Sequence, residues 1–230
     1  MAGFKVDLHN HSLASPDGAL TENDYRHMLN SGHLDYIAIT DHNTAEFALE
    51  MRKKIGPRII VGEEIRTTKG EIIGLYLKQT IPKLMSPQDT VTAIREQGGL
   101  VCIPHPFEDV RRGMSQSDLD TIAEAVDLIE VHNGRAFFQN KSRQAYEWAA
   151  KHKVVGVANS DSHAMSGWGQ TYSVVASEPN RDNLVSLMAE ATLQVGFPGF
   201  RAILYPKYNR FKKYAAKRTT WSGRSGKDKA

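Results

Sequence analysis

The sequence has few of the features that mark secreted or membrane proteins. It holds one cysteine, Cys102, among 230 residues, so no disulfide framework can form within the chain, and this fits a reducing cytosol. No apolar run approaches the roughly 18 residues that span a bilayer, and the first residues resemble no signal segment. Cys102 lies in the apolar run Leu100–Ile103, which predicts a buried structural thiol. We therefore expect a cytoplasmic protein without a membrane span.

Acidic residues are scarce at the C-terminal end. Residues 201–230 contain ten Lys and Arg but a single acid, Asp228, a local charge of +9, whereas residues 1–200 carry −6. We therefore divide the chain into a domain of residues 1–200 and a basic tail of residues 201–230. In the tail, Tyr205–Lys217 could form a basic helix and Arg218–Ala230 is expected to be disordered. The tail is either a solvated appendage or a segment that docks on the domain, an acidic partner, nucleic acid or membrane.

Short apolar runs alternate with helix-length segments throughout the first domain. The runs are continuously apolar, which is typical of a parallel sheet buried on both faces. About seven such units favour a closed or distorted α/β barrel, (β/α)7, over an open sheet. The expected strands are Lys5–Leu8, Tyr36–Thr40, Ile59–Glu63, Ile72–Leu77, Leu100–Pro104, Leu128–Val131, Val154–Ala158 and Tyr172–Ala176. The expected helices are Thr21–Ser31, Thr44–Ile55, Ser86–Gln97, Ser115–Ala125, Asn140–His152 and Asp182–Glu190.

Histidines and carboxylates gather where these strands end. His9 and His11 are separated by one residue on an extended segment, so their imidazoles point to the same side. Because the carboxyl ends of parallel barrel strands meet on one face, the clusters after several strands should lie together there. Mixed imidazole and carboxylate ligands suit Zn, Mn or Fe better than Ca or Mg. The other clusters are Asp41-His42, Glu63-Glu64, His105, Glu130 to Asn133, and Asp161 to His163.

Five segments, in their order and approximate spacing, resemble the PHP (polymerase and histidinol phosphatase) superfamily over roughly residues 4–176. The resemblance implies a distorted (β/α)7 barrel with its metal site at the C-terminal ends of the strands. It also implies two or three divalent ions, and most studied members cleave phosphate esters. The five segments are Asp7–Ser12, Ile39–Thr44, Gly62–Ile65, Pro104–Phe107 and Asn159–His163.

The resemblance assigns metal ligands to particular residues. A first ion would be held by His9, His11 and Asp161. Glu64 would bridge this ion to a second one, which His105 also binds.

A third ion would lie near His42, His163 and an aspartate. The family usually shows Ser-Asp-Gly, whereas this chain has Ser15-Pro16-Asp17-Gly18, so Asp17 is the candidate. Glu71 stands where many members place a histidine ligand. We interpret Glu71 as a ligand, the alternative being a solvated residue at the entry of a strand.

The predicted function is that of a metal-dependent phosphoesterase. A metal-activated water would hydrolyse a small phosphomonoester, a nucleotide or a short oligonucleotide. Asp41 could move protons, and Arg135 could bind a substrate phosphate, with Arg111 and Arg112 as a second candidate pair. Two alternatives remain open: a dinuclear hydrolase of the amidohydrolase type, and a nucleic-acid-associated metal-binding module. Nucleic acid could then be a partner through the basic tail.

Overall fold

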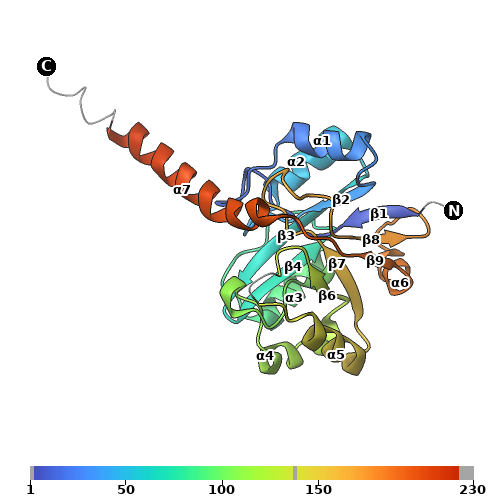
Figure 1. Ribbon diagram of the computed structural model, residues 1–230. Helices are drawn as coiled ribbons and strands as arrows, with labels where there is room; N and C mark the ends of the chain where they lie inside the picture. The colour runs from blue at the N-terminus through green and yellow to red at the C-terminus, as the bar shows by residue number, and fades with distance from the viewer. Residues whose placement is uncertain (1–2, 137–138, 223–230) are drawn as a thin grey trace, which may run out of the picture.

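A single curved sheet forms the centre of the protein. The computed structural model describes residues 3–136 and 139–222, and the described strands follow the order β7-β6-β5-β4-β3-β2-β1-β8-β9. Figure 1 shows the helices arranged around the outside of this sheet. The strands are β1 (Phe4–Asp7), β2 (Tyr36–Ile39), β3 (Ile59–Thr67), β4 (Gly70–Leu75), β5 (Leu100–Ile103), β6 (Leu128–Asn133), β7 (Val155–Asn159), β8 (Tyr172–Val175) and β9 (Thr192–Gln194).

The sheet is nearly closed into a barrel by the segments that follow β1 and β7. Asn10 and Ser162 form a parallel bridge. The amide of Asp161 donates to the His9 carbonyl at 2.8 Å, and the amide of His11 donates to the Ser162 carbonyl at 2.8 Å. The predicted distorted barrel is thus confirmed, and its closure brings the first and last predicted metal-binding segments side by side.

The sheet is mixed, which corrects the expectation that its strands run parallel. Strand β4 is antiparallel to both β3 and β5, and β8 is antiparallel to β1. The reason is local: β3 extends to Thr67 and β4 begins at Gly70. A connection this short permits only a hairpin, because a parallel pair needs a long crossover. Gly70 has φ +133°, a conformation that an L side chain rarely adopts.

Helices cover the outside of the barrel, and several begin where the sequence predicts. Thr21 forms a capping box with Asp24 at the start of α1, and Ser86 caps α3 just before Pro87. The segment predicted as one helix over Ser115–Ala125 is instead a short α4 followed by a 3-10 turn. The remaining helices of the barrel are close to their predicted positions. The six are α1 (Glu22–Asn30), α2 (Glu46–Ile55), α3 (Pro87–Glu96), α4 (Gln116–Asp120), α5 (Ser142–His152) and α6 (Leu184–Ala189).

Apolar side chains fill both faces of the sheet, as the continuous apolar strands predict. Ile37 and Ile39 of β2 belong to the larger cluster beneath the helices. Ala38, between them, belongs to a second cluster that also includes Cys102 and Leu184 of α6. Cys102 is fully buried, as expected for a structural thiol. Burial on both faces leaves the ends of the strands as the place where polar groups can gather.

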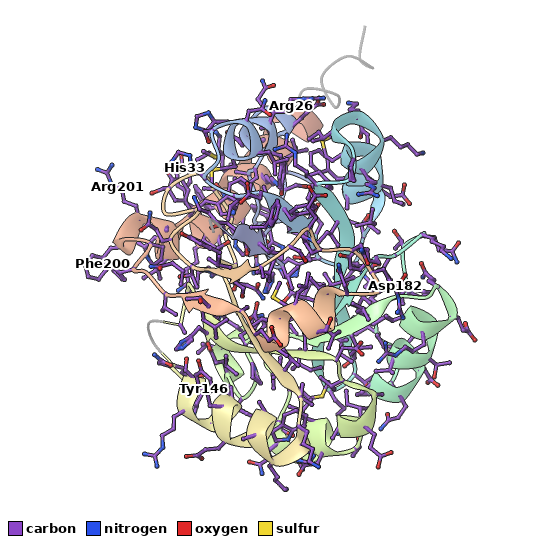
Figure 2. All side chains as sticks on the ribbon, turned by 90° about the vertical axis from the view of Figure 1, so that its right-hand side faces the viewer. Arg26, His33, Tyr146, Asp182, Phe200 and Arg201 are labelled. Carbon is purple, nitrogen blue, oxygen red and sulfur yellow. The ribbon has the colours of Figure 1, made fainter. Side chains whose placement is uncertain are left out.

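A long helix, α7 (Phe200–Ser222), follows the barrel. The sequence predicts this helix over Tyr205–Lys217, and the observed helix is longer at both ends. Residues 223–230 lie outside the described residues. Figure 1 shows its first turns against the barrel and its later turns projecting away from it. In Figure 2, Phe200 and Arg201 point outward at its start. Within the described residues, no helix is both long and apolar enough to cross a bilayer.

Candidate metal centre

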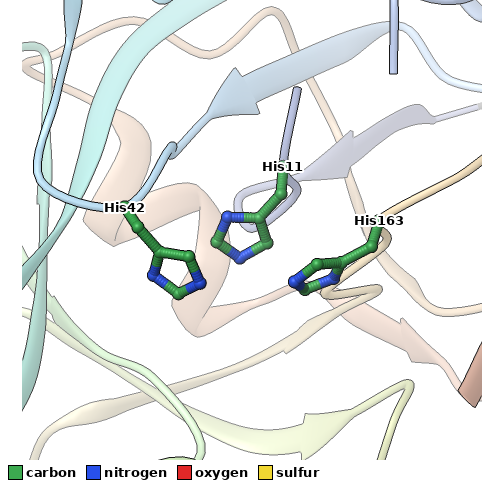
Figure 3. Close-up of side chains that lie close together, drawn as sticks. All are labelled: His11, His42 and His163. Atoms are coloured by element: carbon green, nitrogen blue, oxygen red, sulfur yellow. The ribbon is translucent and has the colours of Figure 1, made fainter. Parts of the chain in front are cut away.

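Imidazole rings from separate parts of the chain meet at the predicted rim. Figure 3 shows His11, His42 and His163, from the segments after β1, β2 and β7, directed toward one another. The ring centroid of His11 lies 4.4 Å from that of His42 and 4.2 Å from that of His163. The Nε2 atoms of His9 and His11 are 3.1 Å apart. The structure therefore brings these four predicted ligands into one cluster.

Glu64 lies at the centre of this cluster. Its Oε1 atom is 3.0 Å from His105 Nε2 and 3.5 Å from His9 Nε2. Its Oε2 atom is 2.8 Å from His42 Nδ1 and 3.4 Å from His11 Nε2. Each carboxylate oxygen thus faces two imidazoles, the arrangement expected of a carboxylate that bridges two ions.

Four groups of donor atoms could each hold an ion, and in every group the atoms lie within 4.8 Å of one another. The groups share members, so the ions would be close neighbours with common ligands. They are His9, His11 and Asp161; His9, Glu64 and His105; His11, His42 and His163; and His42, Glu64 and Glu71.

Glu71 reaches the cluster because β4 is antiparallel. It stands near the start of β4, paired with Arg66 near the end of β3, so the reversed strand places its first residues at the rim. Its Oε2 atom is 4.0 Å from His105 Nε2. Burial, and then the negative charge of Glu64, raise the pKa of Glu71 to about 8. The structure therefore places Glu71 where a ligand would be, and a bound cation would relieve the repulsion between the two carboxylates.

Asp17 also faces the cluster, despite the inserted proline. Its Oδ1 atom is 3.5 Å from His42 Nε2 and 3.6 Å from His163 Nε2. The residue is 4% exposed, yet Oδ1 has no hydrogen-bond partner among the described residues. Such an orphaned buried oxygen is costly unless it is paired, so Asp17 fits the predicted third ion.

Three of the candidate ligand histidines, His9, His11 and His163, are held by their Nδ1 atoms, so that Nε2 faces the cluster. His9 Nδ1 is 2.8 Å from Glu130 Oε1 and His11 Nδ1 is 3.2 Å from Ser15 Oγ. His163 Nδ1 is 2.9 Å from the carbonyl oxygen of Asp161. These acceptors fix one tautomer and leave the Nε2 lone pair available for a metal.

Glu130 orients a candidate ligand, a role that the sequence analysis did not assign to it. The Nδ1 atom of His9 is held by this carboxylate, which belongs to β6. The same carboxylate accepts from Asn159 Nδ2 at 2.9 Å, the His105 amide at 2.7 Å and Asn133 Nδ2 at 2.8 Å. A buried glutamate at the end of an apolar strand was the available signal, since unpaired carboxylates are rarely buried.

Asp41 occupies a different position from its neighbour His42. Its Oδ1 atom accepts from the Ser12 amide at 2.8 Å and from Ser15 Oγ at 2.6 Å, and its Oδ2 atom accepts from Ser12 Oγ at 2.5 Å. The carboxylate is fully engaged with the loop that precedes Asp17. Asp41 therefore holds this loop in place, and the proton transfer predicted for Asp41 stays a prediction.

Two arginines converge on Asp161. Arg111 Nη1 is 2.6 Å from Asp161 Oδ2, and Arg135 Nη1 is 3.3 Å from Asp161 Oδ1. Both arginines line a cavity of about 820 Å³, which Glu64, His105 and His163 of the cluster also line. The charges of Arg135 and His9 hold the pKa of Asp161 well below its usual range, although burial acts in the opposite direction. Asp161 is therefore ionised, as a ligand must be.

The histidines of the cluster differ in protonation. Burial and then the neighbouring His42 lower the pKa of His11, and burial together with His11 lowers the pKa of His163 well below its usual value. Burial opposes charge on His42 as well, but Glu64 and Asp17 outweigh it and raise the pKa of His42 to about 9. Neutral imidazoles at His11 and His163 are ready to coordinate.

Two candidate ligands have left-handed backbones. The φ angle is +27° at His105 and +50° at Asp161. Such conformations are uncommon for residues other than glycine, and they cluster at functional sites, where surrounding contacts maintain them. In His105 the amide is held by Glu130, and in Asp161 by the His9 carbonyl.

The remaining histidines lie away from the cluster. His132 packs edge-on against Tyr146 of α5, with ring centroids 5.3 Å apart. His27 and His33 stack on each other at 6.1 Å, and His33 is seen at the periphery in Figure 2. His152 stacks on Trp148. All four make ring contacts outside the cluster, and the ligand set that the family resemblance implies contains none of them.

Comparison with known proteins places the chain in a family. It is 32% identical over 150 residues to the protein MJ1587 of Methanocaldococcus jannaschii, an alignment that covers 60% of this chain and 88% of the relative. Residues 139–192 match the family model described as PHP-associated. The chain is a member of the PHP family. For this PHP protein the five sequence segments, the barrel and the family match agree.

Solved structures share the PHP fold at low sequence identity. A two-domain protein from Bacteroides vulgatus, described as containing a predicted PHP-like metal-dependent phosphoesterase, superimposes with a TM-score of 0.66 at 18% identity, covering 90% of this chain and 69% of that one. An amidohydrolase from Chromobacterium violaceum, solved with bound sulfate, gives a TM-score of 0.56 at 18% identity, covering 69% of this chain and 87% of that one.

Proposed function

We propose that this PHP protein is a metal-dependent hydrolase that acts on phosphate esters. The observation that carries the proposal is the position of Glu64, whose two oxygens each face two imidazoles, next to the arginine-bound Asp161. A site that needed only hydrogen bonds would not direct the Nε2 atoms of His9 and His11 at each other. The donor set of buried imidazoles and carboxylates fits two or three ions of Zn, Mn or Fe.

The geometry of the cluster supports a ligand role for each of its residues. We propose His9, His11 and Asp161 for one ion, with Glu64 bridging to a second that His105 and Glu71 complete. His42, His163 and Asp17 would hold a third. Ions bound there would supply Lewis acidity, which acidifies a water molecule and neutralises charge that develops on phosphoryl oxygens.

The residues around the ligands prepare the site for an anionic substrate. Arg111 and Arg135 line the cavity beside Asp161, and guanidinium groups bind phosphate oxygens in bidentate fashion. The exposed side chains of Arg66, Lys83 and Arg112 also line the cavity. This set of basic groups favours a phosphate ester over an amide and accommodates a substrate that extends beyond the scissile phosphate. A nucleotide or short oligonucleotide satisfies this description.

A substrate panel tests the proposal. Protein stripped with a chelator and reloaded separately with Zn²⁺, Mn²⁺ or Fe²⁺ should release phosphate or phosphomonoester from at least one of p-nitrophenyl phosphate, bis-p-nitrophenyl phosphate and nucleotides. The stripped protein should be inactive and recover on reloading. Hydrolysis confined to cyclic or acyl amides would favour the amidohydrolase alternative, and nucleic-acid binding without turnover would favour the metal-binding module.

A further inference from the structure

One face of helix α7 packs against the candidate metal centre and forms hydrogen bonds with its loops. Pro206, Asn209 and Lys213, spaced by three and four residues, share one side of the helix. Pro206 and Asn209 are buried, whereas the adjacent Lys207 and Lys212 are exposed. The buried side of α7 therefore lies against the rim of the barrel, at the cavity that Pro206 helps to line.

Asn209 joins the two segments that carry the outermost ligands. Its Nδ2 atom donates to the carbonyl oxygen of Asp17 at 2.8 Å and to that of His163 at 3.2 Å. A single side chain from α7 thus ties together the loop after β1 and the turn after β7. The residue is 6% exposed, so water competes little for these bonds.

Two basic residues of α7 extend the attachment. Arg210 Nη2 is 2.7 Å from Asp17 Oδ2, which leaves Oδ1 as the oxygen that faces His42 and His163. Lys213 Nζ donates to three carbonyl oxygens of the same loop: those of Leu13 and Gly18, each at 2.8 Å, and that of Ser15. Because one ammonium group binds three carbonyl oxygens, Lys213 stabilises the conformation of the loop over residues 13–18.

We propose that α7 is a brace for the outermost metal position, with Asn209 and Lys213 as positioning residues that hold Asp17 and His163 toward His42. The proposal rests on the proposed metal-dependent function. It adds that the outermost ion depends on the C-terminal helix, whereas the ion held by Glu64 and His105 does not. The described hydrogen bonds and ion pairs of Glu64 and His105 join neither residue to α7.

Paired lysine variants provide the test. Lys213→Met and Lys212→Met remove the same charge from neighbouring positions, but Lys212 is exposed and makes no hydrogen bond or ion pair among the described residues. Asn209→Leu removes both donor bonds while keeping the branching of the side chain and adding no charge. For each variant, Mn²⁺ affinity and stoichiometry are measured by equilibrium dialysis with elemental analysis, alongside the melting temperature.

The brace predicts that one equivalent of Mn²⁺ binds about tenfold more weakly in Asn209→Leu. Lys213→Met should weaken the same equivalent, while the other equivalents and Lys212→Met match the wild type. If Asn209→Leu does not fold, the comparison of the two lysine variants decides. Unchanged affinity in Lys213→Met, or equal weakening of every equivalent, would overturn the brace. A wild-type protein that binds no Mn²⁺, Zn²⁺ or Fe²⁺ would instead defeat the proposed function itself.

Discussion

Replacing Glu130 by glutamine tests whether the metal centre depends on a carboxylate that binds no ion itself. The carboxylate of Glu130 is buried and accepts four hydrogen bonds, two on each oxygen: from His9 and Asn159 on Oε1, and from His105 and Asn133 on Oε2. Glutamine has the same size but offers only one acceptor oxygen. Whichever way the amide turns, its NH₂ group meets two donors.

The magnitude follows from those lost bonds. Hydrogen bonds to a charged group contribute about 1.5–3 kcal/mol each, and a buried pair that loses one charged partner is destabilised by about 3–5 kcal/mol. We therefore expect Glu130→Gln to lower the free energy of unfolding of the metal-free protein by about 3–5 kcal/mol. Metal affinity should fall by about 10–100-fold, because His9 loses the acceptor that fixes its tautomer.

Urea unfolding and metal titration measure the two effects. Glu124→Gln is the matched control, since Glu124 is exposed on the 3-10 turn before β6. Wild-type stability together with wild-type metal affinity in Glu130→Gln would refute the reasoning, because it would mean that His9 is oriented without this carboxylate.

Three further predictions concern other residues of the rim and β3. Glu71→His should retain metal and activity, whereas Glu71→Ala should lose affinity for one ion; unchanged stoichiometry in the alanine variant would make Glu71 a bystander. Arg135→Met should raise KM for a phosphate ester by at least about tenfold while leaving metal content intact, and an unchanged KM would remove Arg135 from substrate binding. Burial raises the pKa of Glu63 to about 7, so the folded state retains a proton that the unfolded state releases near pH 4.5. The stability that this group contributes is thus lost as pH rises from about 4.5 to about 7. The free energy of unfolding of Glu63→Gln, minus that of the wild type, should therefore increase by about 3 kcal/mol from pH 5 to pH 8. An equal difference at the two pH values would contradict this prediction.

The sequence predicted which histidines and carboxylates gather in space, because these residues lie at the ends of strands. His9 and His11 share a side of one extended segment, and Asp161 and His163 follow another strand directly. Adjacent residues of a strand point to opposite faces, so only one of Glu63 and Glu64 could enter the cluster. Glu64 does, while Glu63 accepts from the Ile81 amide on the other side.

The direction of β4 was not predicted, although the signal was present. The segment from Thr67 to Gly70 is too short for a crossover, and Gly70 is suited to a tight turn. Continuous apolar strands suggested parallel pairing because both faces are buried, and burial alone does not fix direction. The antiparallel hairpin is also what brings Glu71, at the start of its strand, to the rim.

Contacts between distant segments could not be read from the sequence. Glu130 orients His9 from 121 residues away, and Asn209 reaches Asp17 across 192 residues. A basic, acid-poor helix looked as much like a solvated appendage as a docked one, since composition does not reveal which side is buried. The three bonds of Lys213 depend on where the barrel closes, which only the assembled fold determines.

The most direct test of the central claim measures metal content and phosphate release in the same samples of wild type and Glu64→Ala. Glu64 contacts four of the proposed ligand histidines, so its removal should lower the number of bound ions by at least one and reduce hydrolysis of the best phosphate ester by at least ~10³-fold. The wild type should carry two or three ions and turn the ester over. Near-normal turnover by Glu64→Ala, with its metal content unchanged, would contradict the account.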